Sequence, residues 1–158
     1  MLLHTNFIGL DEHKAQNLAE SLNELLANYQ VFYQNVRGYH WNIKGEKFFE
    51  LHTKFEELYG NLQLKIDEIA ERILTLGATP LHSFKAYTQL AKVKTVENVH
   101  DAKEAVRGIL EAFHLLLFLQ RALLKESEEA QDEGSNALMS DYIREQEKLV
   151  WMYAAYLA

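Results

Sequence analysis

The chain has 158 residues, 48% of them hydrophobic and 25% charged, and its 23 acidic against 16 basic residues give a net charge of −7 at pH 7. This length supports one buried core and is too short to expect two, so we expect a single domain over residues 1–158. The acidic balance argues against general affinity for phosphate backbones, and the absence of cysteine excludes disulfides and thiolate metal sites.

No stretch of the sequence predicts a membrane span or a secretory leader. The longest apolar run, around residues 115–119, is far shorter than the roughly 20 residues that cross a bilayer. The first residues, MLLHTNFIGLDEH, lack a basic region followed by a small-residue cleavage site. We therefore expect a soluble cytoplasmic protein.

A first helix is predicted after a short tail. Asp11 is suited to cap its start, and Gly38 lies near its predicted end, so that His40 and Trp41 follow the helix. Residues 42–45 then predict a turn. The apolar residues that recur at helical spacing are Leu18, Leu22, Leu25, Leu26, Tyr29, Phe32 and Val36.

The second predicted helix has a clear apolar face centred on Leu62. Taking 3.6 residues per turn, its other members fall within about 40° of that centre. They are Phe48, Leu51, Phe55, Leu58, Ile66, Ile69, Ile73 and Leu76. The helix is expected to end at the segment LGATP, because Gly77 suits a C-terminal cap and Pro80 blocks continuation.

A second stripe on the same helix contains His52, Glu56, Asp67 and Glu71, centred roughly 130° from the core face. His52 and Glu56 are one turn apart, and so are Asp67 and Glu71. The two pairs, however, are separated by roughly 22 Å at a rise of 1.5 Å per residue. Metal–ligand distances are about 2.0 to 2.6 Å, so a single ion cannot contact both pairs.

The numbering of this stripe is symmetric about the bond between residues 61 and 62. Three pairs are centred there: His52 with Glu71, Glu56 with Asp67, and Phe49 with Leu74. Two antiparallel copies of the helix crossing at this point would set the histidine-bearing pair of one subunit against the acidic pair of the other. Gly60 would allow the backbones to approach. The pattern therefore predicts a metal site shared between subunits.

The rest of the chain predicts a crossover and two further helices. Residues 78–94 are too long for a tight turn and are expected to carry a short helix that starts at Ser83, with Phe84, Tyr87 and Leu90 packing on a neighbour. Thr95 is suited to cap a third helix that continues towards Glu126. Its apolar residues are Val99, Val106, Leu110, Phe113, Leu117 and Leu124.

A polar loop, ESEEAQDEGS, separates this helix from a fourth. The apolar residues of the fourth helix are Leu138, Tyr142, Leu149, Met152 and Tyr156. Short first and third connections with one long crossover in the middle are typical of a ferritin-like bundle. The predicted fold class is therefore all-α, a ferritin-like four-helix bundle whose long middle crossover carries a short helix.

Three segments, NVRGYHWNIKG, then FxELHxxFEELY, then KIDEIAERILxLG, resemble the signature of the Dps family, the mini-ferritins. The resemblance covers most of the chain. It implies an iron-oxidising centre at a two-fold interface, with His40, His52 and Glu56 as ligands from one subunit and Asp67 and Glu71 from its neighbour. Glu56 stands where many members have Asp, so its carboxylate reaches further, and a direct and a water-mediated role both remain open.

The resemblance also assigns roles outside the ligand set. It implies that Trp41 lies near the metals and takes up stray oxidising equivalents, whereas the structural alternative is simply buried aromatic area. Asp132 and Asp141 match positions that line a negatively charged iron pore in the family, where Ala137 replaces a third acid. The alternative for Asp132 is that it caps the fourth helix.

The function implied by this resemblance is ferroxidase activity with iron storage. Fe(II) would be oxidised, preferentially by hydrogen peroxide, and ferric mineral would collect inside a hollow dodecamer, protecting against oxidative stress. Imidazole and carboxylate ligands without thiolate suit Fe(II), and they would also hold Zn(II) or Co(II).

Three alternatives remain open. The motifs Glu97–His100 and Glu111–His114 both have the ExxH spacing of di-iron bundles, but both are predicted on the third helix and the fourth has no histidine; His114 is expected in the core or a cavity wall. A DNA-compacting role would need a basic tail, yet the first ten residues contain no Lys or Arg, so DNA binding is not expected. A purely structural bundle would show no metal dependence.

Overall fold

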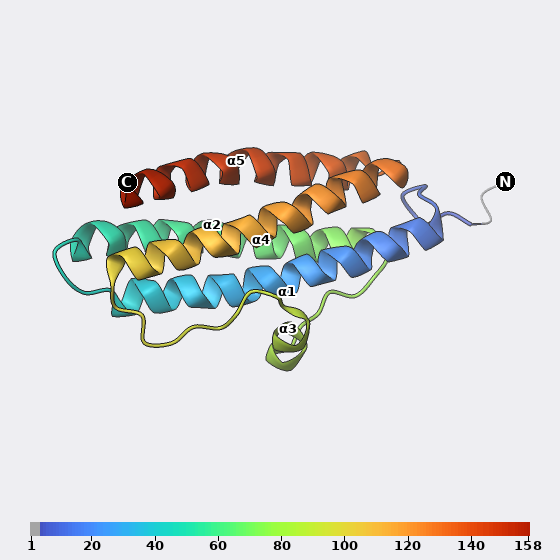
Figure 1. Ribbon diagram of the computed structural model, residues 1–158. Helices are drawn as coiled ribbons and strands as arrows, with labels where there is room; N and C mark the ends of the chain where they lie inside the picture. Colours follow the sequence, from blue (N-terminus) through green and yellow to red (C-terminus); the bar gives the residue numbers. More distant parts are fainter. Residues whose placement is uncertain (1–3) are drawn as a thin grey trace.

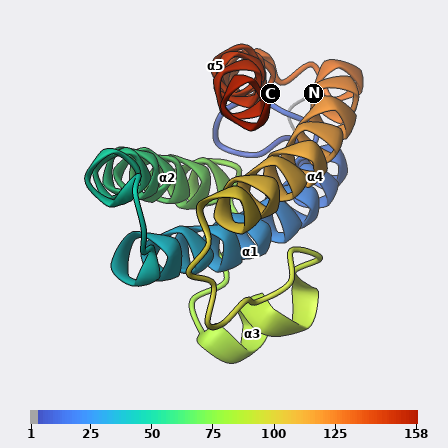
Figure 2. The same ribbon diagram turned by 60° about the vertical axis from the view of Figure 1, so that its left-hand side comes forward.

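The computed structural model describes residues 4–158 and contains five helices over that range. They are α1 (Glu12–Asn42), α2 (Phe48–Thr75), α3 (Phe84–Leu90), α4 (Ala102–Glu129) and α5 (Glu133–Leu157). The four long helices lie side by side, and the short α3 lies in the connection from α2 to α4, on the outer side of α1 (Figure 1). Viewed more nearly along the helices, α3 and α5 lie on opposite sides of the bundle (Figure 2). The predicted all-α four-helix bundle with a short helix in its middle crossover is confirmed.

Three predicted helix ends are confirmed, two by side-chain hydrogen bonds and one by its backbone conformation. Asp11 Oδ1 accepts from the Lys14 backbone N–H at 2.9 Å, and Ser83 Oγ accepts from that of Ala86 at 3.2 Å. Gly77 has a φ of +90°, which favours glycine, and the chain turns there at the end of α2.

Helix α1 is longer than predicted. Gly38 lies inside it, and the backbone N–H of Ile43 still donates to the Tyr39 carbonyl at 3.0 Å. His40 and Trp41 therefore belong to the last turn of α1 and do not follow the helix. A lone glycine in a helix is unfavourable by only about 1 kcal/mol, which tertiary packing readily offsets.

The predicted cap at Thr95 is wrong, because α4 begins at Ala102 with Asp101 as its cap. Two α1 asparagines bind the backbone of the preceding segment, which is not helical. Asn28 Oδ1 accepts from the backbone N–H groups of residues 92 and 93 at 2.8 and 2.9 Å, and Asn35 Oδ1 accepts from that of Val96 at 3.1 Å. These backbone donors are thus satisfied without a helix.

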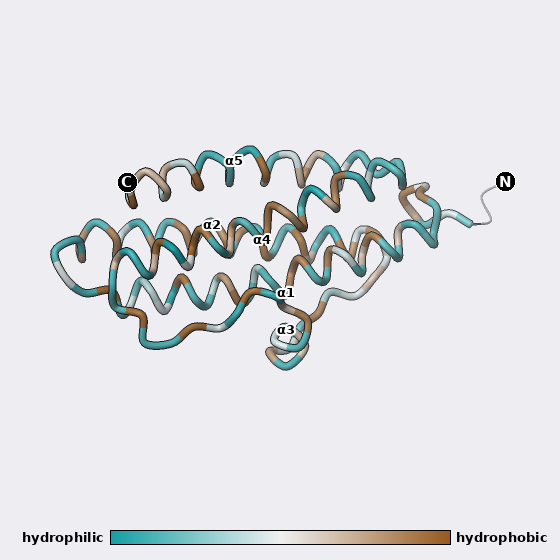
Figure 3. The backbone as a smooth tube through the Cα atoms, viewed as in Figure 1, coloured by the Kyte–Doolittle hydropathy of each residue, from teal (hydrophilic) through white to brown (hydrophobic). Residues whose placement is uncertain are grey.

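The predicted polar loop is also mostly helical, since α4 continues to Glu129 and only residues 130–132 separate it from α5. The core follows the predicted faces, and apolar residues gather on the inner sides of the long helices (Figure 3). One predicted core member, Met152, is instead 44% exposed. In the part of the chain that the structure describes, no helix is long and apolar enough to span a membrane.

Candidate metal centre

The antiparallel packing of α1 and α2 brings His40 and His52 together. Their rings are stacked, with centroids 3.8 Å apart and planes inclined by 13°. His40 Nδ1 donates to the His52 backbone carbonyl at 2.6 Å, and His52 Nδ1 donates to the His40 carbonyl at 2.7 Å. The structure thus brings together two of the predicted ligands that lie twelve residues apart in the sequence.

The reciprocal hydrogen bonds determine which ring nitrogens can bind a metal ion. A carbonyl oxygen only accepts, so Nδ1 must carry the proton in both rings. In a neutral imidazole the other nitrogen, Nε2, then keeps its lone pair. A hydrogen bond from the second ring nitrogen to a carbonyl is the arrangement that commonly orients metal-binding histidines. The two rings therefore present two oriented Nε2 lone pairs that can bind a metal ion.

Aromatic side chains that the sequence analysis did not connect with the site hold these rings. Phe48 stacks on His52 with a centroid distance of 5.0 Å, and Tyr59 meets the His40 ring edge-on at 5.3 Å. His40 is only 7% exposed. A possible signal was available, because Tyr59 follows His52 by two helical turns and so lies on the same side of α2.

Glu56 lies one turn after His52 on α2 and is exposed. Its Oε1 accepts a long hydrogen bond of 3.4 Å from the Tyr59 hydroxyl. Hydrogen bonds at this distance are weak, so the carboxylate is available to a ligand.

Asp67 and Glu71 lie further along α2, and both are exposed. The structure does not bring them to the histidines, from which helix geometry separates them by roughly 22 Å. Within residues 4–158, no three His, Cys, Asp or Glu side chains lie close enough to hold a metal ion. Large apolar side chains are exposed on the same helix: Phe49 is 82% exposed, Leu64 68% and Leu74 58%.

Trp41 is not buried in the chain. Its side chain is 56% exposed, next to His40 in the last turn of α1, and the Arg37 guanidinium carbon lies 4.7 Å from its ring centroid. The interpretation of Trp41 as buried aromatic area therefore fails for the isolated chain. Nearby, burial raises the pKa of Tyr39 to about 12, and the charges of Glu111 and Glu104 add to the effect.

The two ExxH motifs do not share a helix. Glu97 and His100 lie in the segment before α4, where His100 Nδ1 lies 3.0 Å from the Asn42 carbonyl oxygen. Glu111 and His114 lie on α4. His114 is exposed, so a core position is wrong, and a position on a cavity wall stays a prediction.

Asp132 is the cap of α5, so the capping interpretation is confirmed. Its Oδ1 accepts from the Ser135 backbone N–H at 3.1 Å and pairs with Arg72 Nη2 at 2.5 Å, and the residue is 2% exposed. Its buried Oδ2 has no hydrogen-bond partner among the residues described. Asp141 lies on the surface and pairs with Arg144 at 2.8 Å. The pore role of both residues stays a prediction.

Comparisons with known proteins agree with this fold. A family model described as a ferritin-like domain matches residues 19–158. A "DNA protection during starvation protein" of Porphyromonas gingivalis is 40% identical over 94% of this chain and 93% of its own length. The crystal structure of a Dps protein from Vibrio cholerae, described as a member of a broad superfamily of ferritin-like diiron-carboxylate proteins, superposes with a TM-score of 0.97 at 59% identity, covering 98% of each chain.

A second solved structure extends the agreement to a more distant relative. It is a Dps protein from Bacillus brevis, with a TM-score of 0.89 at 34% identity, covering 92% of this chain and 98% of that one. The sequence signature, the helix arrangement and the similarity to these relatives all agree, and the chain belongs to the Dps family of ferritin-like proteins.

Proposed function

We propose that the protein is a ferroxidase and iron-storage protein of the cytoplasm. It oxidises Fe(II), preferentially with hydrogen peroxide, at sites between subunits, and stores ferric mineral in a hollow dodecamer that protects against oxidative stress. The observation that carries this proposal is the reciprocal pair of hydrogen bonds between His40 and His52, which leaves both Nε2 atoms available to a metal ion. Membership of the Dps family supports it.

The proposed centre combines His40, His52 and Glu56 of one subunit with Asp67 and Glu71 of a second. The helix separation of roughly 22 Å requires this division between chains. Neutral imidazoles and carboxylates suit Fe(II), and the anionic oxygens favour the ferric product because of its higher charge. Zn(II) or Co(II) would fit the same ligands.

The reaction balances with two ferrous ions for each peroxide. Each Fe(II) gives up one electron, the O–O bond breaks, and two hydroxide ions form. The imidazoles and carboxylates hold the iron while this happens. Trp41, exposed beside His40, would intercept stray oxidising equivalents. Asp141, on the surface, would line an iron pore in the assembled shell, and Asp132, which is 2% exposed, would reach that pore only by releasing Arg72.

Aerobic iron loading tests this proposal. The purified protein should oxidise Fe(II) faster with peroxide than with oxygen alone, and it should elute as a large closed assembly. A mass near that of a monomer or simple dimer, or iron oxidation no faster than in buffer, would contradict it. The same measurements separate this function from that of a purely structural bundle, which would show no metal dependence.

A further inference from the structure

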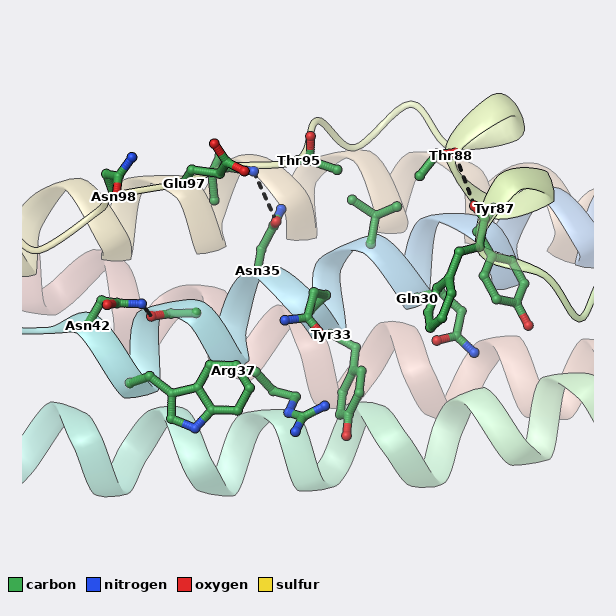
Figure 4. Close-up of a pocket in the computed structure, with 16 residues that line it drawn as sticks. Gln30, Tyr33, Asn35, Arg37, Asn42, Tyr87, Thr88, Thr95, Glu97 and Asn98 are labelled. Carbon is green, nitrogen blue, oxygen red and sulfur yellow. Dashed lines mark hydrogen bonds between the residues drawn. The ribbon is translucent and has the colours of Figure 1, made fainter.

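Arg37 lies one turn before His40 on α1 and is held between two aromatic rings. Its guanidinium carbon lies 4.7 Å from the Trp41 ring centroid and 5.4 Å from that of Tyr33. Figure 4 shows Arg37 and Tyr33 extending from α1 in the direction of α2. Arginine stacks readily on aromatic faces, and such packing restricts its side chain before any partner binds.

This cation has no carboxylate partner within residues 4–158. Among the residues described, Arg72, Arg121 and Arg144 each form an ion pair with an acidic side chain, whereas the half-buried Arg37 and the exposed Arg107 form none. Arg37 also lines a cavity of about 790 Å³ between α1, α3 and residues 95–98, so space is open beside it. A half-buried, immobilised and unpaired arginine is well suited to a carboxylate from outside the chain.

The register of α1 against α2 indicates which carboxylate this is. Tyr33 contacts Tyr59 at a centroid distance of 6.0 Å, and His40 stacks on His52. Arg37 lies between these two contacts and is therefore level with residues 55 and 56 of α2. In the proposed two-fold pairing, residue 56 faces Asp67 of the partner subunit.

The charge of the proposed centre agrees with this placement. Glu56 contributes one negative charge, and the two acidic ligands of the second chain contribute two more. One Fe(II) ion leaves an excess of one negative charge, and the metal-free centre has an excess of three. Arg37 is the nearby cation that reduces this repulsion between the two helices.

We propose that Arg37 forms an ion pair with Asp67 of the partner subunit, which positions this ligand and stabilises the two-fold interface. The inference rests on the proposed function, because it uses the same pairing of subunits. A guanidinium that binds one carboxylate oxygen leaves the other for the metal ion. Arg37 is thus a positioning residue that acts through Asp67.

A charge exchange in metal-free protein tests the pair directly. Arg37→Glu sets like charges against each other, and so does Asp67→Arg. Each single variant should raise the dissociation constant of the two-fold dimer roughly tenfold or more, and the double variant should return to within about threefold of the original protein. The double variant should still lack rapid iron oxidation, because Asp67 is gone. A double variant that dissociates as readily as the single variants would overturn the proposal, and so would single variants with unchanged dissociation.

Two further sets of variants keep the test interpretable. Arg107→Glu makes the same charge change at an exposed α4 arginine and should leave dimer dissociation unchanged. If circular dichroism shows that Arg37→Glu does not fold, Arg37→Gln should weaken the dimer and Arg37→Lys should largely restore it; equal dissociation of both would contradict the pair. Loss of iron oxidation in the original protein would instead refute the proposed function, because the charge exchange is measured without iron.

Discussion

His40 and His52 each donate Nδ1–H to the backbone of the other, so the orientation of both rings depends on local contacts within α1 and α2. The sequence could predict that these residues lie together, because the HW and H positions resemble a family signature. It could not predict the donor nitrogen, because that depends on which carbonyl lies opposite each ring. Ring orientation is a tertiary property that residue spacing does not encode.

The first prediction concerns the removal of one imidazole. His40→Ala should lower the rate of rapid iron oxidation at least tenfold, because one of the two Nε2 ligands is lost. Stopped-flow absorbance of ferric product measures this rate, and elution volume should stay unchanged. His114→Ala, at an exposed position of α4, is the matched control, and its rate should equal that of the original protein. Slow oxidation by His114→Ala with normal oxidation by His40→Ala would place the site at the Glu111–His114 motif instead.

The second prediction concerns pH. Because Nδ1 carries the hydrogen-bonded proton in both rings, a metal ion and an added proton compete for the same atom, Nε2. Metal binding should therefore be weaker at about pH 5 than at about pH 7. Titration with Co(II), followed by its visible absorption, measures this. Equal affinity at both pH values would show that the imidazoles are not ligands.

At the scale of helices, the apolar face of α2 and the caps at Asp11 and Ser83 were predictable because they depend on residues close in sequence. The start of α4 was not. Asn28 and Asn35 accept hydrogen bonds from backbone groups some 60 residues later, so the non-helical segment before α4 depends on a contact between distant parts of the chain. Capping patterns contain no information about such a contact.

The third prediction tests that contact. Asn28→Ala removes an acceptor shared by the backbone N–H groups of residues 92 and 93 and should lower the free energy of unfolding by about 2 to 4 kcal/mol. Urea unfolding followed by circular dichroism gives this value. Asn17→Ala, at an exposed α1 position, should change it by less than about 0.5 kcal/mol. Equal effects would mean that the crossover is not held through Asn28.

For the whole molecule, the fourth prediction is assembly of each centre from two chains. His52→Ala and Asp67→Ala preparations should each lose rapid iron oxidation, because both centres of every dimer are broken. In co-assembled shells, a mixed dimer regains one complete centre. Random pairing makes about half of the dimers mixed, so roughly a quarter of the original rate should return.

Two measurements are needed to interpret that experiment. Each variant must form shells alone, as shown by light scattering, and the mixture must be refolded together so that the chains exchange. If properly assembled mixed shells regain no activity, both ligand pairs belong to one chain or the site lies elsewhere.

The fifth prediction is that linear DNA is not retained at about 0.15 M salt. The net charge is −7, and the first ten residues contain no Lys or Arg, so these residues offer no basic contacts to the phosphate backbone. Gel retardation measures retention, with a basic DNA-binding protein as the positive control. A retarded band at this salt concentration would give the DNA-compacting function new support.

The division of the ligands along α2 also affects the biosynthesis of the protein. All five proposed ligands lie within residues 40–71, so a nascent chain has both half-sites once its first two helices are made. Each half-site is completed only when a second subunit binds. Under the proposed pairing, a newly released subunit has no complete oxidation centre, and Fe(II) oxidation begins only after dimerisation. A single unassembled chain is thereby spared from catalysing iron–peroxide chemistry on its own surface.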